Sequence, residues 1–227
     1  MQKLVKGIHS FQRGFFATHR DLFKRLATEG QTPETLFITC SDSRVVPNLI
    51  TGTEPGELFI VRNVGNVVPR LALPGGTAAA IEYATEVLGV KDIIVCGHTQ
   101  CGAIDAVLNP EKMDSLPMVK RWLAETSRVH QVVNDRYADL SPEERAIAAV
   151  QENVLAQLEH LREYPFVQSR LEKGLIHVSG WVFEIGTGQV YGFDPDLMEF
   201  VPLGGGGGNE NDNESGNESG NEKPSVP

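Results

Sequence analysis

The stretch KDIIVCGHTQCGAIDAVL (residues 91–108) decides the fold, because a strand-like apolar run, KDIIVCGH (91–98), is followed by a short polar loop and the start of a helix. Two earlier runs, TLFITC (35–40) and ELFIVRN (57–63), have the same strand-like composition. A predicted helix from Gly75 to Gly89 separates the second run from the third. Strands that alternate with helices of this length are typical of a mostly parallel, buried sheet. The sequence therefore predicts an α/β fold.

Residues 1–30, ahead of the first strand, are predicted to be helical. Apolar side chains recur there at intervals of three and four residues, at Leu4, Ile8, Phe11 and Phe15. Thr18 stands where it can cap a second helix, and Gly30 is expected to end that helix. These residues form an N-terminal helical arm.

The C-terminal half of the sequence adds further helices and two strands. Residues 117–137 are predicted to be helical. Ser141 and Glu144 have the spacing of a capping box, with a proline between them at the first helical position. LIHVSGWVFEI (175–185) and QVYGFD (189–194) are expected to form a hairpin.

The composition changes abruptly at Gly204. Five consecutive glycines lead into NENDNESGNESGNEKPSVP, which has no large apolar residue before Val226. Such a segment cannot bury enough apolar area to offset its ordering entropy. We therefore expect a folded domain over residues 1–203 and a disordered tail over 204–227, which is either a docking arm or a solvated end.

The bulk composition is that of an ordinary globular protein, with 227 residues, of which 41% are hydrophobic and 22% charged. The formal net charge of −10 argues against nucleic acid as the main partner, because phosphate binding needs clustered Lys and Arg. The sequence contains no signal-peptide pattern and no apolar run long enough to span a membrane. The three cysteines fit free thiols in a reducing compartment, so we expect a cytoplasmic location and no membrane partner.

Two short motifs carry the candidate chemistry. C-S-D-S-R (40–44) and H-T-Q-C (98–101) each begin where a predicted strand ends. Because sites in open parallel sheets form at the carboxyl ends of strands, the two motifs can converge. Thiolates and imidazole are ligands that zinc prefers, and three protein ligands leave one coordination position for water, which is the catalytic arrangement. A zinc site on Cys40, His98 and Cys101 is the first hypothesis.

The residues alone leave alternatives open. Cys96 shares a strand face with His98 by two-residue alternation, so geometry alone does not exclude it as a ligand, although its apolar neighbours favour a core role. Each motif taken singly also has an ordinary explanation, as a small core cysteine, a loop histidine or a turn with a local ion pair. The pairing of both motifs at strand ends favours the metal site.

The charge of this ligand set suggests what Asp42 and Arg44 do. Zn²⁺ with two thiolates and a neutral imidazole has a net charge near zero, so its water should have a pKa above the ~7 of three-histidine sites. Asp42 could accept a hydrogen bond from the zinc-bound hydroxide and aim it at the substrate, while Arg44 keeps the carboxylate ionised and oriented. If that pair breaks, the carboxylate could instead take the open zinc position and close the site.

At these residues the sequence resembles the β-class carbonic anhydrases, over about residues 1–200. The pairing of C-S-D-S-R with H-x-x-C-G is specific to that family, and R-N-V-G-N (62–66), G-G-T-A-A-A-I-E-Y-A (75–84) and G-W-V-F (180–183) fit it too. The segments HRDLF, PNLIT and YPFVQSRLEKG are most similar to the cyanobacterial, carboxysome-associated members.

The resemblance implies an enzyme that reversibly hydrates carbon dioxide to bicarbonate and a proton. It implies one Zn²⁺ per chain on Cys40, His98 and Cys101, with Asp42 and Arg44 as the catalytic dyad. It also implies a small substrate pocket, some of it supplied by a second subunit, formed by Gln31, Phe59, Val64, Tyr83 and the backbone amide of Gly102.

The same resemblance implies a four-stranded, mostly parallel sheet with an added edge strand, flanking helices and an N-terminal helical arm. The subunits are expected to form dimers that exchange their N-terminal helices, and these dimers often pair further. A carboxysome scaffold protein is a further candidate partner, with the carboxysome as a candidate location.

Two residues depart from the members that carry an inhibitory bicarbonate pocket. Those members have Trp three residues before the first cysteine ligand and Tyr after G-W-V, whereas this sequence has Phe37 and Phe183. Arg62, the third residue of that pocket, is present. Because phenylalanine offers no N–H or O–H to an anion, we expect an open site and no inhibitory pocket.

Two other functions compete with carbon dioxide hydration. The same zinc site with a narrowed entrance could hydrolyse carbon disulfide or carbonyl sulfide, and assays of both reactions would separate them. A zinc-stabilised assembly protein is the alternative from another class, but it would need neither an Asp–Arg dyad nor an open metal position. Nucleotide binding is not indicated, because no glycine-rich phosphate motif occurs.

Overall fold

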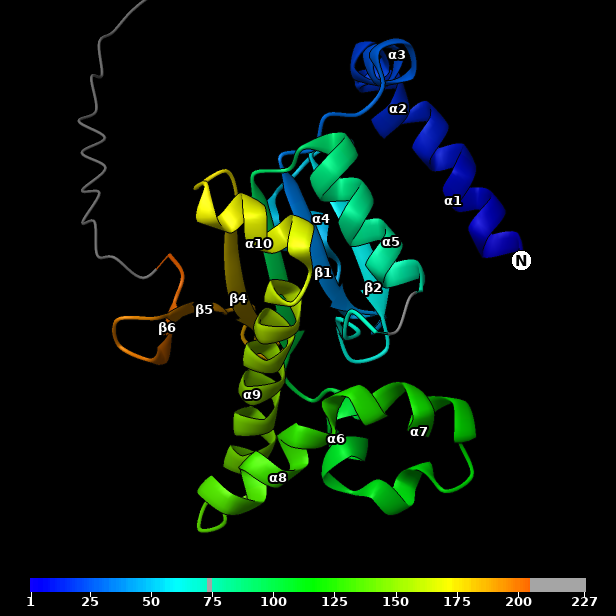
Figure 1. Ribbon diagram of the computed structural model, residues 1–227. Coiled ribbons are helices and arrows are strands. Elements are labelled where there is room, and N and C mark those ends of the chain that lie inside the picture. The colour runs from blue at the N-terminus through cyan, green and yellow to red at the C-terminus, as the bar shows by residue number, and fades with distance from the viewer. Residues whose placement is uncertain (73–74, 205–227) are drawn as a thin grey trace, which may run out of the picture.

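The computed structural model describes residues 1–72 and 75–204 (Figure 1). Six strands form one sheet in the order β2-β1-β3-β4-β5-β6. The strands are β1 (Thr35–Cys40), β2 (Leu58–Asn63), β3 (Asp92–His98), β4 (His177–Phe183), β5 (Val190–Asp194) and β6 (Glu199–Pro202). The first four in spatial order are parallel, whereas β5 and β6 are antiparallel. The predicted α/β fold with a four-stranded parallel core is therefore confirmed.

The sheet continues one strand further than the single added edge strand that we expected. After β5 the chain turns back, with the amides of Asp196 and Leu197 donating to the Asp194 carboxylate. Met198 adopts a left-handed φ of 58° at the end of this turn, and β6 then pairs with β5. The predicted tail lies outside the described residues except for Gly204.

Helices surround the sheet and separate its strands along the chain. They are α1 (Gln2–Arg13), α2 (Phe15–Thr18), α3 (Arg20–Glu29), α4 (Pro47–Thr51), α5 (Gly76–Glu82), α6 (Gly102–Leu108), α7 (Pro117–Leu123), α8 (Ser127–Arg136), α9 (Pro142–Arg162) and α10 (Pro165–Glu172). A π-helical segment, Tyr83–Leu88, extends α5 to Gly89. Shorter 3₁₀ turns lie at Pro110–Met113 and Ala124–Thr126.

The predicted helix ends are mostly right. Ser141 and Glu144 form the expected capping box at the start of α9. The prediction for Thr18 is wrong: His19 occupies the N-cap position of α3, and no side-chain hydrogen bond caps that helix. The Thr18 hydroxyl instead donates to the backbone carbonyls of Gly14 and Phe15 within its own helix.

The longest helix, α9, lies against one face of the sheet, where it packs on β3 and β4 (Figure 1). Two strand glycines allow the close approach. A Cβ atom on Gly97 would lie 2.8 Å from Val154 Cγ2, and one on Gly180 would lie 2.7 Å from Val154 Cγ1. Valine side chains of α9 therefore fill the space above the two glycines, directly before the carboxyl end of β3.

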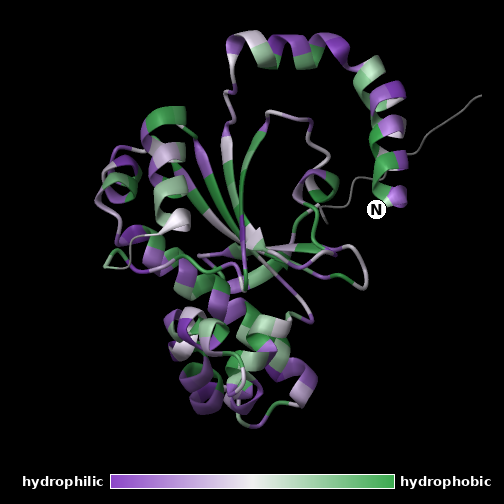
Figure 2. Cartoon of the chain, turned by 90° about the vertical axis from the view of Figure 1, so that its right-hand side faces the viewer, coloured by the Kyte–Doolittle hydropathy of each residue, from purple (hydrophilic) through white to green (hydrophobic). Residues whose placement is uncertain are grey.

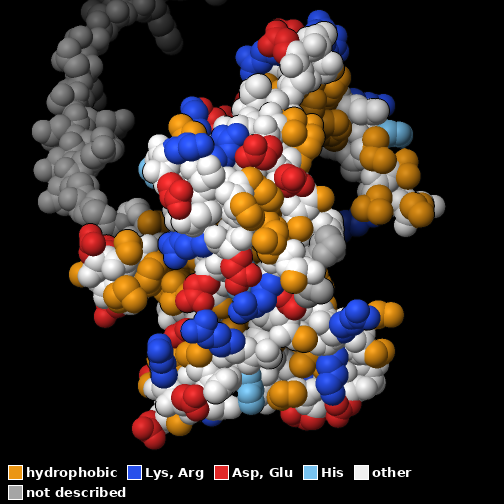
Figure 3. Space-filling model, viewed as in Figure 1, with side chains coloured by type: hydrophobic (Ala, Val, Ile, Leu, Met, Phe, Trp, Pro, Cys, Tyr) orange, Lys and Arg blue, Asp and Glu red, His pale blue; other side chains and the backbone are white. Residues whose placement is uncertain are grey.

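The N-terminal arm, α1 to α3, has a different character. None of its residues is buried. The arm arches away from the sheet, alternates between hydrophilic and hydrophobic residues along its length (Figure 2), and carries hydrophobic side chains on its surface (Figure 3). Leu4, Ile8, Phe11 and Phe15, the residues whose spacing predicted the helix, are all exposed. None of the described helices has the length and apolar character needed to cross a membrane.

Candidate metal centre

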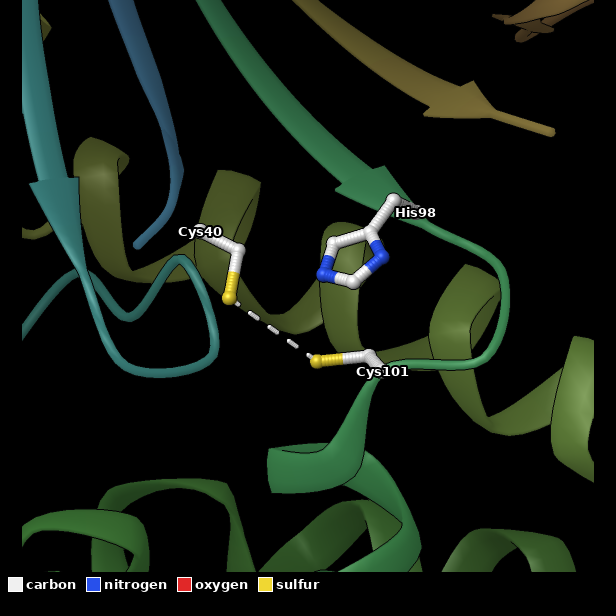
Figure 4. Close-up of side chains that lie close together, drawn as sticks. All are labelled: Cys40, His98 and Cys101. Carbon is white, nitrogen blue, oxygen red and sulfur yellow. Dashed lines mark hydrogen bonds between the residues drawn. The ribbon is translucent and has the colours of Figure 1, made fainter. Parts of the chain in front are cut away.

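The two candidate motifs meet at the carboxyl edge of the parallel strands. Cys40 is the last residue of β1, His98 is the last residue of the neighbouring β3, and Cys101 precedes α6 as its N-cap. Their ligand atoms all lie within 4.8 Å of one another, and the two sulfurs are 4.0 Å apart (Figure 4). All three side chains are buried, although they come from separate segments.

This group fits a tetrahedral zinc ion. Zinc–sulfur bonds of about 2.3 Å place two thiolate sulfurs about 3.8 Å apart in tetrahedral geometry, close to the observed separation. His98 Nδ1 donates to the Thr99 carbonyl oxygen at 2.9 Å, which leaves the lone pair on Nε2. Within residues 1–72 and 75–204, His98 Nε2 is one of two buried side-chain polar atoms without a hydrogen-bond partner. A metal ion would satisfy it.

Each of the two thiols affects the ionisation of the other, so a cation would be needed to hold both as thiolates. Hydrogen bonding from Cys101 lowers the pKa of the Cys40 thiol. The same interaction, together with burial, raises the pKa of Cys101 well above its usual range. One thiolate therefore forms easily and opposes the second. A divalent cation between the sulfurs would remove that opposition, as zinc does when it binds cysteine pairs as thiolates.

The third cysteine lies apart from this group. Cys96 belongs to a separate apolar cluster with Phe37 and Ile94, and its thiol donates to the Gly97 carbonyl oxygen. Burial raises the pKa of Cys96 to about 12. A buried thiol in apolar surroundings does not ionise near neutral pH, so this environment is that of a core residue.

Asp42 and Arg44 form a two-pronged ion pair beside the metal ligands. Arg44 Nε donates to Asp42 Oδ1 at 2.9 Å and Nη2 donates to Oδ2 at 2.8 Å, while the Arg44 amide also reaches Oδ1 at 3.0 Å. These hydrogen bonds hold the pKa of Asp42 well below its usual range. Asp42 Oδ2 lies 3.9 Å from His98 Nε2, so an ionised carboxylate faces the position that a metal would occupy.

Two further residues position this loop, and the sequence analysis missed the first. Gln100 accepts from Arg44 twice, through its side-chain oxygen at 3.3 Å and its backbone carbonyl at 3.1 Å. Its left-handed φ of 57° is uncommon for a glutamine, and no local sequence pattern predicts this conformation. Arg62 donates to the backbone carbonyls of Cys40 at 3.1 Å and Asp42 at 2.7 Å, so it fixes the backbone of this loop.

The five residues of the predicted substrate pocket fall in three places within one chain. Val64 directly follows β2 and Gly102 begins α6, both at the carboxyl edge of the sheet. Phe59 lies near the amino end of β2 and packs on Tyr83, with ring centroids 6.0 Å apart. Gln31 precedes β1, at the edge of the sheet opposite Cys40. A single chain therefore does not bring all five together.

Comparison with known proteins agrees with this geometry. The sequence model of the carbonic anhydrase family matches residues 35–190. A carbonic anhydrase of Synechocystis sp. is 45% identical over 203 residues, which cover 88% of this chain and 74% of the relative. The solved structure of the β-carbonic anhydrase CcaA has a TM-score of 0.87 at 45% identity and covers 89% of this chain and 92% of its own.

A more distant solved structure has the same fold. It is one of two tetrameric β-carbonic anhydrases of Sordaria macrospora, with a TM-score of 0.77 at 30% identity over 84% of this chain and 95% of its own. The family match includes both candidate motifs and extends over most of the described chain. This chain therefore belongs to the β-class carbonic anhydrases, zinc enzymes that convert carbon dioxide and water to bicarbonate and a proton.

Proposed function

We propose that Cys40, His98 and Cys101 hold the catalytic zinc and that the Asp42–Arg44 pair directs the reaction. The observation that carries this assignment is a buried, unpartnered His98 Nε2 within 4.8 Å of two cysteine sulfurs. Zinc, when bound, acidifies a coordinated water and so supplies the nucleophile for carbon dioxide. The surrounding side chains then decide where that nucleophile points.

Asp42 has the properties of an orienting group. Its carboxylate lies 3.9 Å from His98 Nε2 and is ionised, so it can accept a hydrogen bond from the reacting water and fix its direction. Because hydrogen bonds from Arg44 hold the pKa of Asp42 well below its usual range, the carboxylate does not retain the proton near neutral pH. The proton that hydration releases must therefore pass to another acceptor.

Arg44 keeps the site open in this proposal. The carboxylate could reach the metal only if Arg44 released it, and Arg44 is itself held by both acceptors of Gln100. We therefore propose the open arrangement, in which the Asp42 carboxylate is bonded to Arg44 and leaves the fourth metal position to water. Stopped-flow measurement of carbon dioxide hydration, with metal analysis of the same sample, tests the assignment. About one zinc per chain, activity lost on chelation and activity restored by zinc are expected; full activity in a zinc-free chain would contradict it.

Bicarbonate is expected to inhibit only as the product, without cooperativity. Phe37 is fully buried against Trp181, and Phe183 joins the same apolar cluster, so neither ring offers a hydrogen-bond donor to an anion. The Arg62 guanidinium is already engaged with the backbone carbonyls of Cys40 and Asp42. Sigmoidal inhibition by bicarbonate that disappears in Arg62→Ala would show that an inhibitory pocket exists.

We further propose that the chain works as a homodimer or a larger homo-oligomer whose subunits exchange N-terminal arms. The exposed apolar residues of the arm support this, and so does the position of Gln31, which could join a pocket at Cys40 only from a second subunit. The Sordaria macrospora relatives are described as tetrameric. Light scattering over a concentration series measures the oligomer size, and a monomer at all concentrations would refute the proposal.

The remaining proposals concern the domain boundary and the cellular partner. Residues 1–203 are proposed as the catalytic unit, so a chain ending at residue 203 should keep its zinc, oligomer size and activity. A cytoplasmic location with a carboxysome scaffold protein as partner is proposed from the resemblance to cyanobacterial members. Co-purification of scaffold protein with the full-length chain but not with the truncated one would assign the docking to residues 204–227.

A further inference from the structure

The loop that follows β2, residues 64–69, is irregular yet mostly buried. Gly65 and Asn66 have left-handed φ values of 80° and 47°, and residues 65 to 69 are all buried. An irregular buried segment has no ladder partners for its backbone amides and carbonyls, and each unpaired group costs free energy. The loop therefore needs donors and acceptors from another element.

One face of α9 supplies them. The face carries Asn153, Gln157 and His160 at intervals of four and three residues, and Tyr164 follows beyond the end of α9, at the N-cap of α10. All four side chains are buried, and the spacing places the first three on one side of α9. We call these four residues the α9 ladder.

Each member of the α9 ladder contacts the loop backbone. Asn153 Nδ2 donates to the Gly65 carbonyl oxygen at 3.1 Å, and the Val68 amide donates to Gln157 Oε1 at 2.8 Å. The other two contacts are His160 Nδ1 to the Val68 carbonyl oxygen at 2.8 Å and the Tyr164 hydroxyl to the Pro69 carbonyl oxygen at 2.6 Å. Gln157 also donates to Asn153 Oδ1, so the first two members are joined.

The end of the loop nearest Asn153 touches the metal centre. The Gly65 amide is among the groups that lower the pKa of the Cys40 thiol. A Cβ atom on Gly65 would lie 3.2 Å from the Ala103 Cβ, two residues beyond Cys101. Asn63, just before the loop, accepts from the Ser41 amide through its carbonyl oxygen and bonds to Val67 through its side chain. Pro69, at the other end, contacts only Tyr164 of the ladder.

A neighbouring side of α9 is fixed beside His98. Val154 and Val150 lie over Gly97, the residue before His98, so closely that no Cβ would fit there. One helix thus packs behind His98 with its apolar side chains and holds the loop beneath Cys40 with its amides. Both contacts are within one turn of Asn153.

We propose that Asn153 is a positioning residue for the zinc centre, acting through Gly65 on the loops that carry Cys40 and Cys101. Its amide holds the Gly65 carbonyl, and the segment around Gly65 lies against Ala103 and is bonded to Ser41 through Asn63. The other end of the α9 ladder, at Tyr164, fixes the same loop without reaching a ligand and serves its stability alone. This inference rests on the assignment of Cys40 as a zinc ligand.

Two matched variants separate positioning from scaffolding, because each leaves one buried loop carbonyl without its donor. Asn153→Ala is expected to weaken zinc binding about tenfold or more in competition with a chelator, in the range found when an outer hydrogen-bond partner of a ligand is lost. Tyr164→Phe should lower the unfolding midpoint comparably but leave zinc affinity within about twofold. Asn153→Ser keeps a hydroxyl for Gln157 but does not reach Gly65, and it replaces the alanine variant if that chain does not fold.

A second readout does not depend on hydration activity. In the cobalt-substituted protein, the thiolate-to-cobalt absorption band should shift in Asn153→Ala and stay unchanged in Tyr164→Phe. Equal zinc affinity in the two variants, or affinity that only follows their loss of stability, would overturn the proposal. If Cys40→Ala keeps full zinc, the ligand assignment itself fails, and this outcome is distinct because it does not involve Asn153.

Discussion

The carboxyl edge of the sheet and the N-terminal arm are built in opposite ways. At the edge, Cys40, His98 and Cys101 are buried, and the loops that carry them are bonded through Arg62, Gln100 and α9. In the arm, three helices contain no buried residue, and apolar side chains such as Leu4, Ile8 and Phe11 are exposed. An apolar surface of this kind is typical of an interaction site, and a second subunit is the partner that we propose for it. The difference teaches that a single chain brings its three candidate ligands together, whereas the apolar residues of its arm remain exposed.

The comparison makes the metal edge sensitive to single side chains and the arm insensitive to them. Ligand atoms must lie at fixed separations, whereas an apolar stripe tolerates substitutions that keep its character. Four sets of variants test this division.

Removing a ligand should have the largest effect. His98→Ala and Cys101→Ala are expected to lose most of the bound zinc and nearly all hydration activity, because two remaining ligands do not hold a catalytic zinc. Cys96→Ala is the matched control, since Cys96 is buried but lies in a separate apolar cluster. Metal analysis of the three purified variants decides the question: zinc retained in Cys101→Ala but lost in Cys96→Ala would reverse the assignment.

Asp42→Asn should keep zinc and lower activity by about 10²–10⁴-fold, the usual contribution of a positioned polar group. Because Arg44 holds the pKa of Asp42 well below its usual range, Asp42 stays ionised from pH 6 to 9 in the wild type. The ratio of wild-type to variant activity should therefore be the same at both ends of that range, as measured by stopped-flow hydration. A ratio that changes steeply with pH would mean that Asp42 itself titrates there.

Deleting residues 1–29 should change assembly while leaving the metal edge intact. We expect a smaller oligomer by light scattering, with the zinc content per chain unchanged, because the arm joins β1 at its amino end whereas Cys40 and His98 lie at the carboxyl ends of their strands. A gentler version replaces Phe11 and Phe15 by serine, since both rings are exposed within the arm. An unchanged oligomer after deletion would remove the arm from the interface.

Two glycine substitutions measure the smallest effects. Gly97→Ala should destabilise the chain by about 1–3 kcal/mol, the usual cost of overpacking, because the new Cβ would lie 2.8 Å from Val154 Cγ2. Gly7→Ala meets nothing within 4 Å and replaces a glycine inside α1, so it should stabilise that helix by about 0.5–1 kcal/mol. Chemical unfolding measures the change in Gly97→Ala, and hydrogen exchange measures the change in Gly7→Ala. Effects of the same sign and size would contradict the contrast between a tightly packed sheet edge and a loosely packed arm.

The sequence predicted most of the fold because its strands are short apolar runs bounded by polar loops. β1 has the predicted bounds, and β2 and β3 each begin one residue later than predicted. β6 was missed because its four residues have no strand signal of their own and are defined by pairing with β5. Thr18 was misassigned because its hydroxyl donates to backbone carbonyls of its own helix and so does not cap the next one.

The sequence also indicated the candidate site but not what holds it. The strand-end motifs were visible in the sequence, whereas the support from Gln100 depends on a left-handed backbone that a glutamine rarely adopts. The α9 ladder did have a readable signal, since Asn153, Gln157 and His160 are polar residues at helical spacing. Its meaning depends on a loop that lies 88 to 95 residues away in sequence and that only the folded chain brings alongside.

The distribution of the ligands along the chain has a consequence for folding. His98 and Cys101 are near neighbours in the sequence, but the two sulfurs are separated by 61 residues. Parallel strands require a long crossover connection, so β1 and β3 pair only after the intervening chain has been arranged. A nascent or misfolded chain can therefore offer zinc only the local pair, and the free energy of full coordination becomes available only when non-local pairing is complete. The rate of metal uptake during refolding would therefore report the formation of the β1–β3 pair. Only chains that have formed this pair would bind zinc through all three ligands.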